Sequence, residues 1–304
     1  MIGAWKSWVL KVLVLLVLGS AVVAAVLLME QQRPVAGRSA ELSYLPKGKY
    51  LKVAVLGYRH IAADLIWLKA VQYFGDMKQT AGGFRWAYHA TDVVTDLDPE
   101  FMIAYQAGGT ILGVWSGLMD ESIALLKKGM RHNPNDWRFP FLIGYDYFYE
   151  LCDSANGAKY FQMASTLPGA PTYLARLAAR LSVEAGDPDA AMEFLARFSG
   201  QVADQRLKEA LNLRMKEVVV ERDVRKLEDA ARQFQTRLGR LPLRIEELVE
   251  HKIIHALPVE PFGGHYVVLP TGAVVSTELK ERLRSYRKVA CPSRKTAAMA
   301  VAQG

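Results

Sequence analysis

Three histidines near the carboxyl end are the residues whose type and spacing best suit metal chemistry. His251 and His255 are four residues apart, and His265 follows ten residues later. On a helix, two histidines at that spacing lie on one face and can bind a metal ion together. The run His-Lys-Ile-Ile-His lacks the glutamate that acts as general base in helical zinc proteases. We therefore expect surface histidines, with no metal site and no cofactor.

Other residues with catalytic potential do not converge either. Glu246 and Glu247 are consecutive, so we expect a solvated face and no acid–base pair. Gly108-Gly109-Thr110 lies inside a predicted helix and does not suit a phosphate-binding loop. The chain has no Gly-x-Ser-x-Gly nucleophile motif. These patterns predict that the protein is not an enzyme.

Three aspartates gather at the end of a helix predicted over residues 84–97. Asp92, Asp96 and Asp98 would lie near the negative end of the helix dipole, which is unfavourable for carboxylates unless they are paired. A basic partner or a cation is the alternative to a merely solvated cluster.

A dense aromatic segment suits the binding of a partner better than it suits catalysis. It holds seven rings: Trp137, Phe139, Phe141, Tyr145, Tyr147, Phe148 and Tyr149. Most of them must be core, but they surround a single predicted helix, so some tyrosines should face a surface groove. Aromatic anchors in a groove are typical of peptide recognition.

The elements that position these residues recur with a fixed period. Pro99, Pro134 and Pro168 are 35 and 34 residues apart, and each follows a predicted helix. Small residues recur in step at spacings of 35, 35 and 34: Ala87, Ser122, Gly157 and Ala191. A period in this range indicates stacked helix pairs. The predicted helices cover residues 61–75, 84–97, 120–132, 137–151, 155–165, 171–185 and 189–198.

At these residues the chain resembles the tetratricopeptide repeat (TPR) family, over about residues 61–198. The third repeat carries Ile143-Gly144-Tyr145-Asp146-Tyr147, the second Gly108-Gly109 with Leu112, the fourth Ala178-Ala179, and the first Ala70 and Tyr73. Ser122 and Gly157 replace the usual alanine. The resemblance implies antiparallel helix pairs with a partner-binding groove; a generic helical bundle is the alternative. The candidate groove residues are Tyr105, Gln106, Tyr145, Tyr149, Arg176 and Arg180.

The amino terminus predicts a membrane anchor. Val12 to Met29 are 18 uncharged, mostly apolar residues, and Trp8, Val9 and Leu10 extend the run to the length that a bilayer requires. Lys6 and Lys11 place the amino terminus in the cytoplasm and the large domain in the bacterial periplasm. A signal peptide cleaved after Val23-Ala24-Ala25 is the alternative. Residues 30–52 are rich in breakers and are expected to form a tether.

The carboxyl-terminal third changes character. Amphipathic helices over about 203–238 are expected to cap the repeats, within a segment 201–239 that ends at Gly239. A short helix from Pro242 to about His251 and a β-hairpin of Tyr266–Leu269 and Ala273–Ser276 are expected within 240–278. The run from Gly239 to Tyr266 is similar to the carboxyl-terminal element of type II secretion major pseudopilins, as a local likeness. Residues 279–304 are expected to be a basic flexible tail.

The net charge of +7 is confined to the two ends. Residues 1–52 hold seven basic and two acidic residues, and so do residues 278–304, whereas residues 53–277 carry a net charge of −3. This distribution argues against nucleic acid as a partner. Two cysteines, Cys152 and Cys291, exclude a disulfide scaffold, and we expect both to be free thiols because no spacing pairs them.

The sequence thus predicts a mainly α fold: a TPR-like solenoid of antiparallel helix pairs at 53–200, a single transmembrane helix at 1–29 and a small β-hairpin module. The expected function is a membrane-anchored scaffold that binds a protein or peptide in a cell-envelope assembly. The alternatives are an envelope enzyme with a site between the repeats and the carboxyl-terminal module, and a structural subunit of a pilus or secretion machine.

Overall fold

The computed structural model describes residues 17, 18, 20, 24, 45–74, 81–279 and 281–283, and only the backbone for residues 81–85. The chain divides into two units, Met1–Lys47 and Gly48–Gly304, and helices α3 to α13 and both strands belong to the second. The predicted anchor, most of the tether and residues 284–304 of the tail lie outside the described residues. Within the described residues, no helix combines the length and apolar character that crossing a membrane requires.

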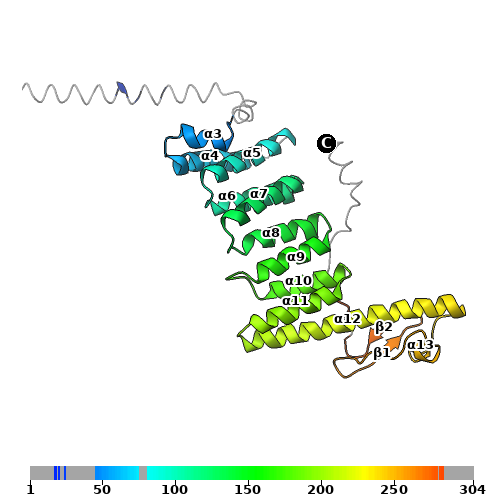
Figure 1. The fold of residues 1–304 in the computed structure, drawn as a ribbon. Helices are drawn as coiled ribbons and strands as arrows, with labels where there is room; N and C mark the ends of the chain where they lie inside the picture. Colours follow the sequence, from blue (N-terminus) through cyan, green and yellow to red (C-terminus); the bar gives the residue numbers. More distant parts are fainter. Residues whose placement is uncertain are drawn as a thin grey trace, which may run out of the picture. The chain divides into compact units, whose positions relative to one another are not determined.

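The second unit is mainly helical with one small antiparallel sheet, as predicted (Figure 1). Its helices in chain order are α3 (Gly48–Ala54), α4 (Arg59–Phe74), α5 (Ala81–Leu97), α6 (Met102–Thr110) with the π-helical segment η2 (Ile111–Trp115), α7 (Met119–His132), α8 (Arg138–Tyr145) with the π-helical segment η3 (Asp146–Glu150), α9 (Ser154–Ser165), α10 (Tyr173–Glu184), α11 (Pro188–Gln201), α12 (Gln205–Leu238) and α13 (Glu247–Glu250). The strands are β1 (Tyr266–Val268) and β2 (Val274–Ser276).

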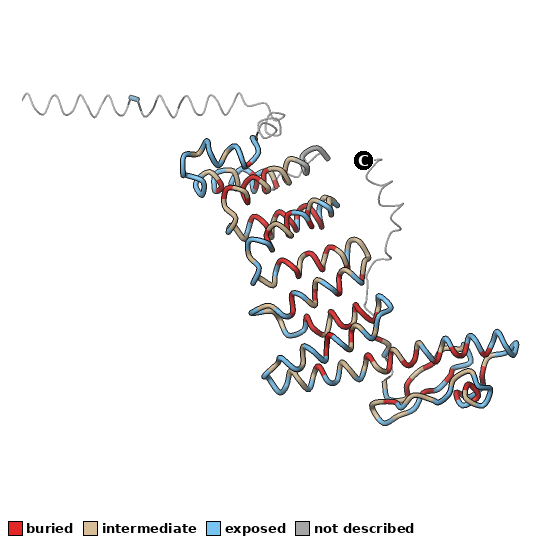
Figure 2. The backbone as a smooth tube through the Cα atoms, viewed as in Figure 1, coloured by how far each residue is buried: buried red, intermediate tan, exposed pale blue. Residues whose placement is uncertain are grey.

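Consecutive helices from α4 to α12 pack against one another in chain order. Alternate helices also touch: α5 contacts α7, α6 contacts α8, η2 contacts η3, and α10 contacts α12. The tube in Figure 2 carries buried residues along the helix sides that face neighbouring helices. The helices predicted between residues 61 and 198 are therefore present, and their boundaries agree with the sequence-based ones to within a few residues.

Small residues lie where helices cross closely. Ala87, Ser122 and Ala191 are fully buried. A Cβ added to Gly144 would lie 2.9 Å from Cδ1 of Phe161 and 3.3 Å from the carbonyl oxygen of Gly157. Since no larger side chain fits between backbones that close, the recurring small residues are explained by packing.

Helix ends follow local chemistry. The carboxylate of Asp187 accepts a hydrogen bond from the amide of Ala190, and Pro188 begins α11. The Asp153 carboxylate caps α9 in the same way, through the amide of Asn156. Gly239 ends α12 in the left-handed conformation with φ of 73°, which confirms the predicted stop.

Three sequence-based boundaries were wrong. The predicted capping helices are one continuous helix, α12, of 34 residues. The helix predicted from Pro242 to His251 shortens to the four residues of α13, with turns on either side. Residues 48–52 of the predicted tether are not a linker, because α3 begins at Gly48 and packs against α5.

The second half of α12 forms a separate core with the hairpin. Strands β1 and β2 pair antiparallel, with Val267 opposite Val275. Val224, Phe234, Leu248 and Val274 are buried in one cluster with Tyr266. The helix α12 therefore serves both parts of the unit, since its first half packs on α10 and α11 and its second half packs on β2 and α13.

Candidate partner-binding face

The unburied sides of α6–η2, α8–η3, α10 and the start of α12 form the candidate site, which we call the alternate-helix face. Because α6 touches α8, η2 touches η3 and α10 touches α12, the solvent-facing sides within each of these pairs lie next to one another. Tyr145 of α8 and Leu177 of α10 pack against the same core. The face is defined by Ile103, Gln106, Val114, Tyr145, Tyr149, Tyr173, Arg176, Arg180 and Arg214, all exposed or half-buried.

Positions on this face repeat every 35 residues, and their chemistry changes along the array. Gln106 corresponds to Phe141 and then to Arg176, and Thr110 corresponds to Tyr145 and then to Arg180. The side chains at these positions are therefore uncharged and polar on α6, aromatic on α8 and cationic on α10. Tyr145 and Tyr149 lie with ring centroids 4.6 Å apart, and Tyr149 is 47% exposed.

Five of the six predicted groove residues lie on this face, and Tyr105 does not. Tyr105 is fully buried, its ring packs edge-on against Phe139 at 5.6 Å, and its hydroxyl donates a hydrogen bond to the carbonyl of Thr95 at 3.5 Å. Burial raises its pKa to about 12. Tyr105 therefore belongs to the core. Sequence reasoning mistook it because it directly precedes the half-buried Gln106.

Arg214 on α12 was missed by sequence reasoning. Its side chain is 14% exposed and its Nη1 lies 2.7 Å from Oε2 of Glu217. Burial lowers its pKa; Glu217 opposes that shift, and the positive charges of Arg180 and Arg176 add to it. The residue could not be found from the sequence because its neighbours on α10 are more than 30 residues away.

A buried carboxylate lies behind the face, where η2 and η3 meet α7. Asp146 is 3% exposed, and its Oδ2 lies 2.6 Å from the hydroxyl of Ser122. That hydroxyl also lies 2.8 Å from the carbonyl oxygen of Gly109. Burial raises the pKa of Asp146 to about 6; the hydrogen bond from Ser122 lowers it and the charge of Glu150 raises it. π-Helical segments often mark functional sites, and here two of them adjoin.

The aspartates at the end of α5 have partners. Lys128 Nζ lies 2.7 Å from Oδ1 of Asp92 and 2.6 Å from Oδ1 of Asp96, and His60 Nδ1 lies 3.1 Å from Oδ2 of Asp98. The ammonium group of Lys128 supplies the basic partner that the sequence offered as an alternative. Asp92 and Asp96 therefore join α5 to α7, whereas Asp98 lies against His60 of α4.

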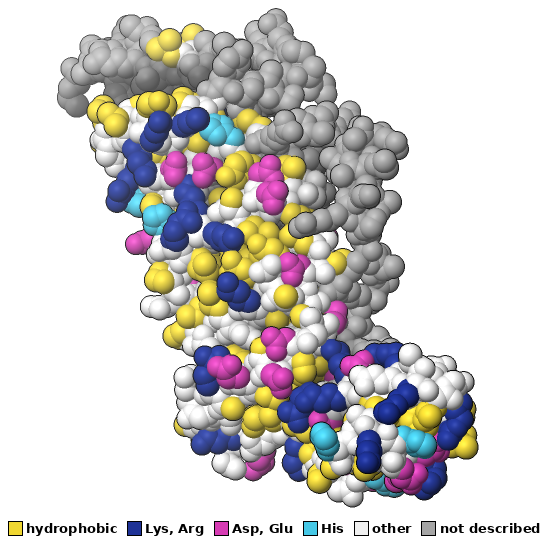
Figure 3. Space-filling view, turned by 45° about the vertical axis from the view of Figure 1, so that its right-hand side comes forward, with side chains coloured by type: hydrophobic (Ala, Val, Ile, Leu, Met, Phe, Trp, Pro, Cys, Tyr) yellow, Lys and Arg dark blue, Asp and Glu magenta, His cyan; other side chains and the backbone are white. Residues whose placement is uncertain are grey.

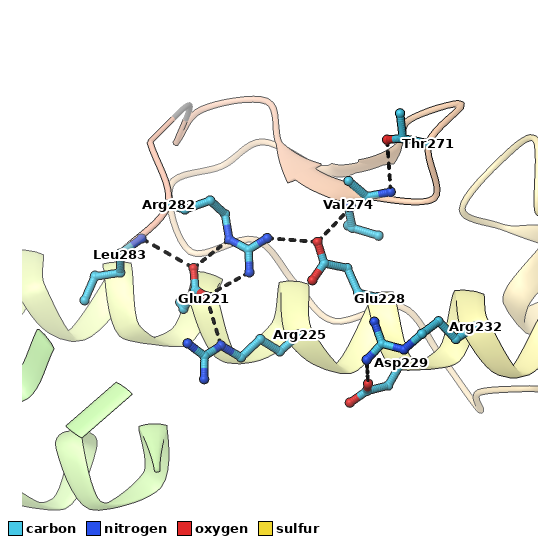
Figure 4. Close-up of polar contacts among 10 residues, drawn as sticks. Glu221, Arg225, Glu228, Asp229, Arg232, Thr271, Val274, Arg282 and Leu283 are labelled. Atoms are coloured by element: carbon cyan, nitrogen blue, oxygen red, sulfur yellow. Dashed lines mark hydrogen bonds and ion pairs between the residues drawn. The ribbon is translucent and has the colours of Figure 1, made fainter. Parts of the chain in front are cut away.

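The carboxyl-terminal module is joined to α12 by a charged network (Figure 4). Arg282 Nε lies 2.8 Å from Oε2 of Glu221, and its Nη1 lies 2.8 Å from Oε1 of Glu228. Glu221 is 3% exposed and also accepts a hydrogen bond from Arg225. Burial raises the pKa of Glu221, but the hydrogen bonds from Arg282 and Arg225 outweigh it and lower that pKa overall. Leu283 is buried as well, so Arg282 and Leu283 of the predicted tail pack against α12.

The turn before the hairpin is closed by Glu260. Its Oε2 accepts hydrogen bonds from the amides of Phe262 and Gly264, and its Oε1 accepts one from the hydroxyl of Ser276. The residues of the pseudopilin-like run therefore build a compact turn, and this role is structural.

The histidines do not assemble a metal site in the described part of the chain. No three His, Cys, Asp or Glu side chains are grouped there to hold an ion. The His251 ring packs edge-on against Phe234, with centroids 5.2 Å apart.

The expectation that Cys152 is a free thiol was wrong. It is disulfide-bonded, and none of the cysteines that the structure describes is a free thiol. The other cysteine of the chain, Cys291, lies outside the described residues.

Charged side chains of both signs are interspersed over the visible face in Figure 3, with no single basic field among the described side chains drawn there.

Comparison with known proteins identifies no relative: no family model, no curated protein and no solved structure matches this chain.

Proposed function

We propose that the protein is a membrane-anchored TPR-like scaffold that binds a partner protein through the alternate-helix face. The observation that carries the proposal is the 35-residue repetition of solvent-facing positions on alternate helices, with small residues buried at the crossings behind them. Such an array presents a rigid row of side chains to a peptide or helix.

We infer the location from the sequence and from two structural features. The predicted span at residues 8–29 is the anchor, with the amino terminus cytoplasmic and the repeats periplasmic. The segment next along the chain exposes large apolar side chains on α3, on α4 and in the turn between them: Val53, Leu56, Ile61, Leu65 and Leu68. Exposed apolar side chains of this number suit a site close to a membrane or partner. The disulfide at Cys152 suits an oxidising compartment such as the periplasm.

Site-specific photocrosslinking in intact cells tests the binding role. A photoreactive residue at Tyr149, on the alternate-helix face, should give a discrete protein adduct. The matched control is Met163 on α9, which is 39% exposed but lies outside that face. Adducts at both positions, or at neither, would remove the support for a binding face.

Protease access tests the orientation. Added protease should cleave the repeat domain in spheroplasts with an intact inner membrane. Protection of the domain until the membrane is lysed would overturn the periplasmic assignment.

A further inference from the structure

Three arginines at one end of the alternate-helix face lack enough acceptors. Arg176 and Arg180 have no carboxylate within ion-pair distance among the described residues, and Glu217 is the one such partner of Arg214 there. The Nε atoms of Arg180 and Arg214 are buried without a hydrogen-bond partner in that same set. Buried donors in native proteins are nearly always paired, so these two donors leave a place for a further acceptor beside Glu217.

The three guanidinium groups also repel one another. Helix α10, which carries Arg176 and Arg180, packs against α12, which carries Arg214. Burial lowers the pKa of Arg214, and the positive charges of Arg180 and Arg176 add to that shift. Like charges held together in this way are costly unless an anion joins them. A carboxylate suits the site best, because guanidinium donors match its two oxygens.

Apolar and aromatic residues follow the arginines in the chain and occupy the equivalent positions of the preceding repeat. Leu177 follows Arg176, and Met215 follows Arg214; both are partly buried against the same core as Tyr145. In the preceding repeat, the positions of Arg176 and Arg180 are occupied by Phe141 and Tyr145. A ligand that spans both repeats therefore needs apolar side chains followed by carboxylates.

From these contacts we infer that the partner segment is an acidic amphipathic peptide, whose carboxylates bind Arg176, Arg180 and Arg214 and whose apolar side chains pack on Tyr145 and Tyr149. This inference rests on the proposed scaffold function and specifies its partner. The peptide runs along the array with its acidic part at the α10–α12 end.

Selection from a random library of 12-residue peptides displayed on phage tests this, with the full chain in detergent micelles as bait. The enriched peptides should combine aspartate or glutamate with leucine or aromatic residues. A synthetic copy of an enriched peptide should bind less tightly as salt concentration rises, because solvent-accessible charges are screened.

The double variant Arg176→Gln/Arg180→Gln should weaken binding of that peptide about ten-fold or more, since two charge-assisted contacts are lost. Both residues are half-buried and unpaired by carboxylates, so this variant should melt like the parent chain. The matched control is Arg131→Gln/Arg197→Gln, which removes the same charge from exposed positions on α7 and α11 and should change affinity less than two-fold.

Enrichment of neutral or basic peptides, or equal affinity of the double variant and the parent chain, would overturn the inference and leave the scaffold proposal standing. Failure to enrich any peptide would overturn both.

Discussion

The buried carboxylate of Asp146 should make the protein less stable as pH rises, and Asp146→Asn should remove that dependence. The Ser122 hydroxyl has one hydrogen but lies within bonding distance of both Asp146 and the carbonyl of Gly109. When Asp146 is protonated, it donates to Ser122, which then donates to Gly109, and every acceptor is satisfied. An asparagine amide donates to Ser122 in the same way, so the variant reproduces the protonated network.

The magnitude follows from the pKa, which is 3.8 for an unperturbed aspartate and about 6 in the folded protein. A raised folded-state pKa means that the folded state binds the proton more tightly than the unfolded state. Its stabilising effect is therefore complete below pH 4 and is lost as pH rises through about 6. A shift of about two pKa units corresponds to ~3 kcal/mol in full, of which ~2 kcal/mol falls between pH 4.5 and 8.

The assay is urea unfolding of the full chain in detergent, followed by circular dichroism between pH 4.5 and 8. The free energy of unfolding of Asp146→Asn, relative to the parent chain, should increase by about 2 kcal/mol across this range. Other titrating groups are shared and cancel in the difference. The control is Asp187→Asn, an exposed helix cap at which asparagine and aspartate are equivalent. Parallel curves for the parent chain and Asp146→Asn would refute the reasoning.

Three further outcomes are expected. Gly144→Ala should cost about 1–3 kcal/mol of stability by overpacking a helix crossing, whereas Gly200→Ala, with no atom within 4 Å of the added Cβ, should cost nothing measurable by urea unfolding. Arg282→Ala should cost about 2–3 kcal/mol because it removes one of the two guanidinium groups that bind the buried carboxylate of Glu221, whereas Arg232→Ala, in an exposed pair, should cost less than about 1 kcal/mol in the same assay. Equal losses within either pair would contradict the packing or burial argument. In a digest made under non-reducing conditions, mass spectrometry should detect one disulfide-linked pair of peptides, which contains Cys152 and the chain's other cysteine. Alkylation of both thiols in the unreduced protein would refute the disulfide.

Local patterns predicted the helices well where small residues, caps and prolines recur. The Gly-Asp-Pro joint before α11 and the stop at Gly239 act through neighbouring residues, so the sequence contains all the necessary information. The short helix after Pro242 was overestimated because turns with apolar residues resemble a helical period over so few positions. Its four residues of α13 are held by contacts with α12, which are distant in sequence.

The residues of the candidate face were likewise predictable only in part from the sequence. The resemblance to stacked helix pairs led us to expect Gln106, Tyr145, Tyr149, Arg176 and Arg180 in one groove, because the first helices of such pairs line the same side. Periodicity could not distinguish Tyr105 from Gln106, since adjacent residues on a helix differ by only 100° and burial depends on the neighbouring helix.

The sequence by itself determined the repeat period, the ends of the helices with clear caps and stops, and the concentration of positive charge at the two termini, because each depends on residue type at short range. The tertiary structure alone decided which charges meet. Arg214 joins Arg176 and Arg180, Lys128 joins Asp92, and Arg282 joins Glu221, across separations of more than 30 residues. Burial and pairing depend on what the fold brings alongside a side chain, and for that reason Asp146 and the arginine cluster emerged only from the packed helices.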